Sequence, residues 1–163
     1  MKTLTLLSML LGLVSSIAAQ TNYSEYRNDR YAFSFKYPSD LLKGEKSDIG
    51  LTLKSSDKRV KIFVYASLNV NKLETGQYAH VHKGVVGCMN GTYSKKTASE
   101  FVFVGTRKKN ACFLRVVRRT DSNSDVYYNV IAEYPNSRRG KWKPIVDRIA
   151  ESLASIHNAD VQP

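Results

Sequence analysis

The chain lacks the local motifs by which many enzymes are identified from sequence. It contains no Gly-x-Ser-x-Gly nucleophile elbow, no phosphate-binding P-loop and no dinucleotide-binding glycine pattern. Its carboxylates are scattered, so no pair of them can be assigned acid and base roles. An enzyme with a dispersed active site is an alternative, because catalytic groups can come together from distant positions. We expect no catalytic residues and no cofactor.

A long apolar run occurs at one place only, near the N-terminus. There, a positive charge at Lys2 is followed by an apolar stretch over residues 4–17, which ends in small residues at Ala18 and Ala19. This pattern predicts a secretory signal peptide over residues 1–19, because a run of about fourteen residues is shorter than the roughly twenty that a membrane span needs. The alternatives are a buried N-terminal helix and a membrane anchor.

The rest of the chain has no second long apolar run and no cysteine before Cys88. These absences exclude a membrane span and a lipid-anchored N-terminal cysteine. Removing 19 of 163 residues leaves 144, a length that suits one domain with one core. We therefore expect an exported protein, periplasmic or secreted, with a linker at 20–29, a single domain at 30–157 and a flexible tail at 158–163.

Acidic residues are few relative to basic ones. The chain has 25 Lys and Arg against 14 Asp and Glu, so loss of Lys2 with the signal peptide leaves 24 − 14 = +10. Such a field attracts anionic glycans, lipid surfaces and acidic proteins. Export makes intracellular nucleic acid an unexpected partner. The alternative is a generic basic surface that only keeps the protein in solution.

Cysteine and histidine are also scarce. The two cysteines, Cys88 and Cys112, form an even pair, which predicts a disulfide in an oxidising compartment; two separate buried thiols are the alternative. The histidines His80 and His82 are close in sequence, but they lie in a predicted helix, where side chains two positions apart point about 200° apart. We therefore expect no metal site.

Alternating apolar and polar residues predict six strands. The first, over residues 31–37, has one face made only of aromatic residues: Tyr31, Phe33, Phe35 and Tyr37. We expect all four rings to point inward, and Pro38 to end the strand. The same pattern predicts further strands at 51–54, 60–68, 100–105, 111–119 and 126–134.

Two segments have helical periodicity. The first helix is predicted over 72–88, with an inward stripe of Leu73, Gln77, Val81 and Val85. The second is predicted over about 142–156, with Pro144 in its first turn. Its apolar stripe is Trp142, Ile145, Val146, Ile149, Leu153 and Ile156. The element order indicates an α+β domain, in which helices pack on a mostly antiparallel six-stranded sheet.

Two stretches resemble PsbP-like domains. Residues 26–38 read Tyr-Arg-Asn-Asp-Arg-Tyr-Ala-Phe-Ser-Phe-Lys-Tyr-Pro, which resembles the aromatic strand, ending in proline, that opens these domains after a short linker. The closing part is similar too, because Tyr134-Pro135 ends a predicted strand and a helix ending in Arg-Ile-Ala-Glu-Ser-Leu follows at 148–153. The resemblance covers residues 26–153 in outline, and its recognisable motifs lie at the two ends.

The resemblance implies an α/β/α sandwich around an antiparallel sheet. PsbP-like domains include extrinsic subunits of the photosynthetic oxygen-evolving complex, a Ran-binding nuclear-import factor of the same fold, and exported bacterial proteins without an assigned role. The predicted export signal argues against a nuclear role, and the leader lacks the features of a thylakoid-targeting peptide. The resemblance therefore implies the exported bacterial group, and the fold alone supplies no function.

Basic residues interleaved with aromatic ones are the lead to a binding site. Cations hold phosphates or sulfates, and rings lie against flat groups. The candidate anion-binding residues occupy a predicted hairpin tip and the outer face of the strand that follows it: Arg107, Lys108, Lys109, Arg115 and Arg119. The alternative is that the aromatic residues lie under a helix and the charges surround the rim of a sandwich.

The sequence therefore predicts an exported, non-catalytic binding protein for a macromolecular partner, with a bias towards anionic ones. Besides the enzyme alternative, an envelope assembly protein or an inhibitor that recognises one protein surface would fit the same residues. A large exposed apolar patch would favour that last class.

Overall fold

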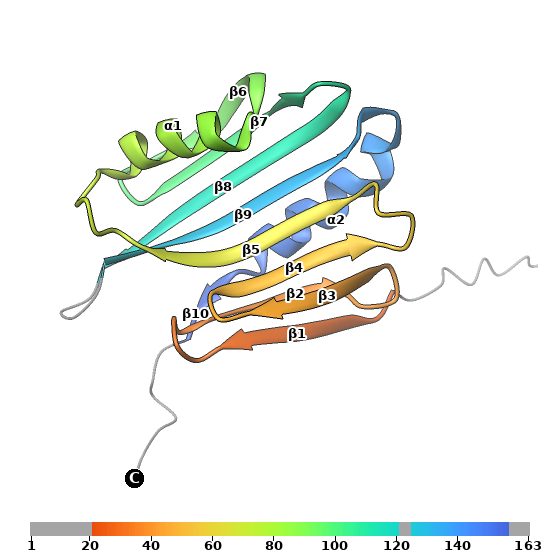
Figure 1. Ribbon diagram of the computed structural model, residues 1–163, viewed down its shortest axis with the longest axis horizontal. Helices are drawn as coiled ribbons and strands as arrows, with labels where there is room; N and C mark the ends of the chain where they lie inside the picture. The colour runs from red at the N-terminus through yellow and green to blue at the C-terminus, as the bar shows by residue number, and fades with distance from the viewer. Residues whose placement is uncertain (1–20, 121–124, 157–163) are drawn as a thin grey trace, which may run out of the picture.

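The computed structural model describes residues 21–120 and 125–156, which form two antiparallel sheets and two α-helices (Figure 1). The larger sheet has seven strands in the order β3-β4-β5-β9-β8-β7-β6. These strands are β3 (Leu42–Ser47), β4 (Gly50–Ser55), β5 (Lys61–Leu68), β6 (Met89–Lys96), β7 (Glu100–Arg107), β8 (Asn110–Thr120) and β9 (Asp125–Pro135). The predicted signal peptide and tail lie outside the described residues.

The smaller sheet has the order β1-β2-β10, with strands β1 (Tyr23–Asn28), β2 (Phe33–Pro38) and β10 (Ala154–Ser155). Helix α1 (Thr75–Val86) lies on one face of the larger sheet, over β6, β7 and β8. Helix α2 (Arg139–Glu151) follows a short 3-10 turn, η1 (Asn136–Arg138), and lies on the other face together with the smaller sheet. The predicted α+β class is confirmed, although the described sheets have seven and three strands rather than one sheet of six.

Strands β8 and β9 form the middle of the larger sheet and are buried on both faces. On β8, Cys112, Leu114 and Val116 pack on the α1 side, whereas Ala111 and Phe113 pack on the α2 side. Successive side chains of a strand point to opposite faces, so each central strand contributes to two hydrophobic clusters. All six predicted strands are strands in the structure.

The aromatic strand belongs to the larger of the two clusters. Phe33 and Phe35 of β2 are fully buried, while Tyr31 and Tyr37 are half-buried and pack against the same cluster. All four rings therefore contact the core, as the alternation predicted. The Phe33 ring lies 5.3 Å from that of Tyr128 on β9, centroid to centroid, which joins the smaller sheet to the larger one.

The predicted linker is wrong for most of its length, because Tyr23–Asn28 is strand β1, paired with β2. Its Tyr26 is buried, and the Tyr26 ring centroid lies 5.3 Å from that of Phe35. The side chain of Asn28 is buried as well and accepts a hydrogen bond from the Tyr31 N–H at 3.0 Å. A single buried ring among polar residues gives too little alternation to be recognised as a strand in sequence.

Strands β3 and β6 were not predicted from sequence either, and they are the two edges of the larger sheet. On β3 only Leu42 is buried, and on β6 no residue is, although Tyr93 is half-buried. The pairing of β6 with β7 contains two register shifts. Edge strands keep polar and charged side chains towards solvent, so the apolar alternation that identifies an inner strand is missing from them.

Helix α1 is present, but its predicted inward stripe is wrong. Val81 and Val85 are 57% and 78% exposed, and the buried residues of the helix are Thr75 and Ala79. The ring of Tyr78 stacks on Tyr127 of β9 at 3.9 Å between centroids. Small residues and one stacked tyrosine therefore face the sheet and fix the rotation of the helix, which apolar residue types alone did not indicate.

Helix α2 is shorter at its end and longer at its beginning than predicted. It ends at Glu151, and Ala154–Ser155 pairs with β2 as strand β10 instead of continuing the helix. It begins at Arg139, so Pro144 lies inside the helix rather than in its first turn. Of the predicted stripe, Trp142, Val146 and Ile149 are buried, which confirms the face that packs on the sheets.

The predicted disulfide between Cys88 and Cys112 is confirmed, with the two Cα atoms 5.8 Å apart. Cys88 follows α1 directly after Gly87, which has a left-handed φ of 66° and whose N–H bonds to the Gly84 carbonyl. The bridge therefore joins the C-terminal end of α1 to the central strand β8. In the part of the chain that the structure describes, no helix is long and apolar enough to cross a membrane.

Candidate functional site

Three chain connections meet at one end of the larger sheet, on the right in Figure 1. The β4–β5 turn lies between Lys54 and Lys61, which pair with each other. The β7–β8 turn lies between Arg107 and Asn110. Asn110 in turn pairs with Pro135, where the chain leaves β9 towards α2. Residues far apart in sequence thus share one surface.

These connections and the start of α2 carry a set of exposed basic residues, which we refer to as the basic end: Lys58, Arg59, Lys61, Arg107, Lys108, Lys109, Arg138, Arg139 and Lys141. Lys58 and Lys108 have left-handed φ values of 57° and 56°. Non-glycine residues rarely adopt this conformation outside turns, and here it places both lysines at hairpin tips. Between the β4–β5 turn, β9 and the start of β8 is an open hollow of about 380 Å³, lined by Lys58, Arg59, Lys61, Asn110, Glu133 and Pro135.

Two carboxylates lie within the basic end, and each is held by neighbouring donors. Asp57 accepts hydrogen bonds from the Ser55 hydroxyl (2.6 Å), the Arg59 N–H (3.1 Å) and Arg138 Nη1 (2.6 Å). These bonds, that of Ser55 first, lower the pKa of Asp57 to about 2. Glu133 accepts from Asn110 Nδ2 (2.7 Å) and Arg107 Nη1 (3.2 Å). The exposed lysines at the turns leave the surface positive.

A second feature, which we refer to as the α1 groove, lies beside the basic end on the α1 face of the sheet. Helix α1 lies over β6, β7 and β8. Strand β5, on the far side of β9, contacts the helix through Tyr65 and Ser67 but keeps Phe63 partly exposed. The groove is a hollow of about 250 Å³ lined by Phe63, Tyr65, Val86, Cys112 and Ile131, with Arg107 and Glu133 at its end. Phe63 is 37% exposed. Its lining is therefore mostly apolar, in contrast to the basic end.

Partly buried polar contacts support one side of this groove. The Tyr65 hydroxyl lies 2.6 Å from His82 Nε2, and the Ser67 hydroxyl lies 2.7 Å from that of Tyr78. Burial raises the pKa of Tyr65 and lowers the pKa of His82. Both side chains are thus neutral at neutral pH, and their hydrogen bond fixes α1 to β5 without adding charge.

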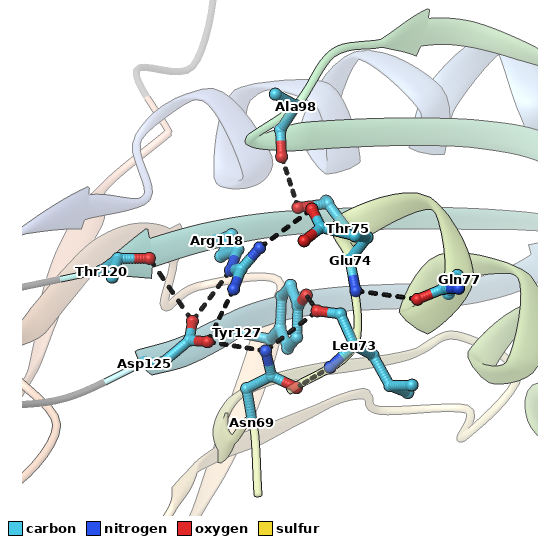
Figure 2. Close-up of polar contacts among 10 residues, drawn as sticks. All are labelled: Asn69, Leu73, Glu74, Thr75, Gln77, Ala98, Arg118, Thr120, Asp125 and Tyr127. Atoms are coloured by element: carbon cyan, nitrogen blue, oxygen red, sulfur yellow. Dashed lines mark hydrogen bonds and ion pairs between the residues drawn. The ribbon is translucent and has the colours of Figure 1, made fainter. Parts of the chain in front are cut away.

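A polar network anchors the other end of α1 (Figure 2). Arg118 donates to both oxygens of Asp125, from Nε at 2.9 Å and from Nη2 at 2.8 Å, and also to Glu74 at 3.3 Å. The Asp125 bond raises the pKa of Arg118, and Arg118 lowers the pKa of Asp125. Asn69 donates to Asp125 (2.7 Å) and to the Leu73 carbonyl (2.9 Å). These groups satisfy one another, so the network is a support for the helix start.

The structure brings three of the sequence-predicted binding residues together and separates two. Arg107, Lys108 and Lys109 lie in the basic end. Arg115 instead donates to Glu100 at 2.7 Å and to the Ala150 carbonyl of α2. Arg119 donates to the Tyr128 hydroxyl at 3.2 Å and to the Ala32 carbonyl at 3.3 Å. These two arginines tie the sheet to α2 and to the start of β2.

The predicted set omitted most of the basic end, namely Lys58, Arg59, Lys61, Arg138, Arg139 and Lys141. A signal for part of it was present, because hairpin strands reverse direction and alternate turns lie at the same end of a sheet. The connections of the β4–β5 and β7–β8 hairpins could have been grouped in this way. Their distance across the sheet depends on the β5–β9 pairing, which the sequence does not indicate.

No family model matches this chain, and no curated protein matches its sequence. Solved structures do match its fold. The cyanobacterial PsbP (CyanoP) of Synechocystis sp. PCC 6803 is 12% identical, with a TM-score of 0.54 over 89% of this chain and 98% of that one. The Ran-binding protein Mog1p of Saccharomyces cerevisiae is 10% identical, with a TM-score of 0.54 over 85% of this chain and 98% of that one.

A structure from Bacteroides thetaiotaomicron VPI-5482 is also similar, at 10% identity and a TM-score of 0.52, over 85% of this chain and 50% of that chain. The fold is therefore that of the PsbP and Mog1 proteins, which confirms the architecture implied by the two terminal motifs. At these identities the similarity establishes the fold alone. Membership of the exported bacterial group stays a prediction.

Proposed function

We propose that this protein is exported and acts without catalysis, by binding an acidic macromolecular partner through its basic end. The observation that supports this function best is the convergence of basic residues from three separate connections at one end of the sheet. The β4–β5 connection supplies the three cations that line the hollow there, Lys58, Arg59 and Lys61. Anionic groups of the partner would contact the lysines at the two hairpin tips. Arg107 and Arg138 are already held by carboxylates, so they orient the surface more than they add charge to it.

A localised site differs from a general positive field in its salt and mutation dependence. Exposed charges more than about 10 Å apart are largely screened at 0.1 M salt. A dispersed net charge therefore gives weak and unselective retention, and reversal of any two lysines would reduce it equally. A site concentrates the effect in the few side chains that line it.

The test compares two double variants that change the net charge equally. Lys58→Glu with Lys108→Glu alters the basic end, and Lys46→Glu with Lys72→Glu alters exposed lysines at the opposite end of the sheet. Lys72 is a matched control, because its φ of 50° is left-handed like those of Lys58 and Lys108. Elution from a heparin column and binding to anionic vesicles would be measured over a salt series.

We expect the basic-end variant to elute at clearly lower salt than both the wild type and the control variant. An equal shift in the two variants would reject the site in favour of a generic basic surface. Retention of both variants at the wild-type salt concentration would reject an electrostatic function.

Export is tested separately, because it rests on residues 1–19 rather than on the site. Residues 1–25 fused to a phosphatase that is active only outside the cytoplasm should give activity, with cleavage near Ala19 seen by N-terminal sequencing. An inactive, uncleaved fusion would contradict export and leave the binding site unaffected.

A further inference from the structure

We propose that the α1 groove accepts one apolar side chain from an acidic segment of the partner, so that the partner is a protein. The inference rests on the proposed function, because the acidic part of that segment is held by the basic end. Charge alone does not distinguish one acidic protein from another. The groove would select those partners that carry an apolar side chain beside their acidic residues.

The groove has an apolar floor and an apolar wall. Phe63 and Ile131 lie opposite each other on β5 and β9 and form the floor. Tyr78 and His82 of α1 contact β5 and β9, and the exposed Val81 and Val85 lie three positions after them. Residues three apart share one side of a helix, so these valines lie on the side of α1 towards β5, next to Val86, which lines the groove.

The groove and the basic end are continuous. Lys61 and Phe63 point to the same face of β5, because they are two positions apart, and this spacing is about 7 Å along a strand. Arg107 contributes to both surfaces, since it lines the groove, belongs to the basic end and keeps a side chain that is 52% exposed. An extended peptide spans the same distance with about two residues. A carboxylate and an apolar residue one or two positions apart would therefore reach the cations and the groove together.

The size and rigidity of the groove favour a single side chain over a larger ligand. Its volume of about 250 Å³ is below the range of about 300–1,000 Å³ that is usual for small-molecule pockets. The Tyr65–His82 hydrogen bond and the Cys88–Cys112 bridge fix α1 beside it. A preformed site loses little conformational entropy on binding, so one well-buried anchor can contribute measurably to affinity.

The test uses two labelled peptides with the protein lacking residues 1–19. One peptide is Asp-Asp-Asp-Trp-Gly, and the matched peptide, Asp-Asp-Asp-Ser-Gly, lacks the apolar anchor. Fluorescence anisotropy would give both dissociation constants at low and at physiological salt. We expect the tryptophan peptide to bind about tenfold more tightly, a ratio that corresponds to about 1.4 kcal/mol.

Two variants locate the anchor. Phe63→Ser should bring the two dissociation constants together while leaving that of the serine peptide unchanged. Val70→Ser is the control, because Val70 is an apolar residue that is 77% exposed outside the groove, and it should keep the tenfold ratio. In case Phe63→Ser unfolds, NMR of the wild type provides a second measurement, in which only the tryptophan peptide should shift the Phe63 and Val85 amide signals.

The possible outcomes distinguish failure of the groove proposal from failure of the proposed function. Equal affinities of the wild type for the two peptides, or an unchanged ratio in a folded Phe63→Ser variant, would overturn the groove proposal and leave the proposed function intact. Binding of heparin or anionic vesicles with no binding of either peptide would assign the basic end to a glycan or lipid and also overturn it. Loss of all binding, heparin included, would reject the proposed function itself.

Discussion

The two faces of the larger sheet differ in how completely they are covered. On the α2 side, the helix and the smaller sheet together bury a cluster that includes Phe33, Phe35, Trp142 and Ile149. On the α1 side, a single helix covers three strands and leaves Phe63 of β5 partly exposed. The first face supplies most of the packing, and the second retains surface that a partner can use. The proposed groove therefore lies on the side of the sheet opposite the face that supplies most of the packing.

The largest expected effect comes from the covered face. Phe35→Ala removes a fully buried ring that contacts Tyr26 and Tyr37, and should lower the free energy of unfolding by about 3–5 kcal/mol. Phe63→Ala on the open face should cost far less, because that ring is already partly in water. Urea unfolding of both variants checks the contrast. Equal losses would show that the open face is as important for stability as the covered one.

The Cys88–Cys112 disulfide should stabilise mainly helix α1, which lies on the open face of the sheet. It closes a loop between residues 24 positions apart, and replacing Cys88 and Cys112 by alanine should cost about 3.5 kcal/mol in the chain-entropy model. Hydrogen exchange should increase in α1 more than in α2. A uniform increase in both helices would mean that the bridge constrains the whole domain rather than α1.

Arg115 lies on the covered face of the larger sheet, although its position in the sequence suggested a binding role. Its pair with Glu100 is largely shielded, with side-chain exposures of 17% and 13%. Arg115→Gln should lower stability by about 2 kcal/mol, the usual size for a hydrogen bond to a charged group. Its elution from heparin should stay close to that of the wild type. A heparin shift as large as that of the Lys58→Glu, Lys108→Glu variant would restore Arg115 to the binding site.

The smallest expected effect is the pH dependence of folding stability that comes from His82, on the open face. Burial lowers the pKa of His82 in the folded state, so below the unfolded value of about 6.5 the unfolded chain binds a proton that the folded chain does not. Stability should therefore fall as pH decreases from about 6.5, by at most about 1.4 kcal/mol per pH unit. His82→Gln should lack this component between pH 5 and 6.5. The carboxylates with lowered pKa values lose their contribution at lower pH, outside that window.

The sequence predicted the parts of the fold in which residue type and burial agree. The aromatic alternation around Phe33 and Phe35, the even cysteine pair and the apolar stripe with Val146 and Ile149 each have one simple cause, and all are found in the structure. The aromatic strand and the last helix also carried the resemblance that led to the correct architecture.

The sequence did not predict features that depend on distant contacts. The rotation of α1 follows from Tyr78 stacking on Tyr127, which is 49 positions away in the chain, so the exposed valines were assigned to the wrong side. The basic end required the pairing of β5 with β9. Arg115 and Arg119 were grouped with Lys108 because of charge and spacing, whereas the structure directs them to α2 and to the start of β2.

The pairing of β10 with β2 has a consequence for the order in which the chain can fold. Ser152 Oγ accepts from the Lys36 N–H at 2.9 Å, across 116 positions, and β10 pairs with β2 next to this contact. A lone two-stranded hairpin is marginal in water, so β1 and β2 cannot complete their packing until α2 and β10 have been synthesised. During that interval the rings of Phe33 and Phe35 lack the part of their cover that α2 supplies through Trp142, Val146 and Ile149.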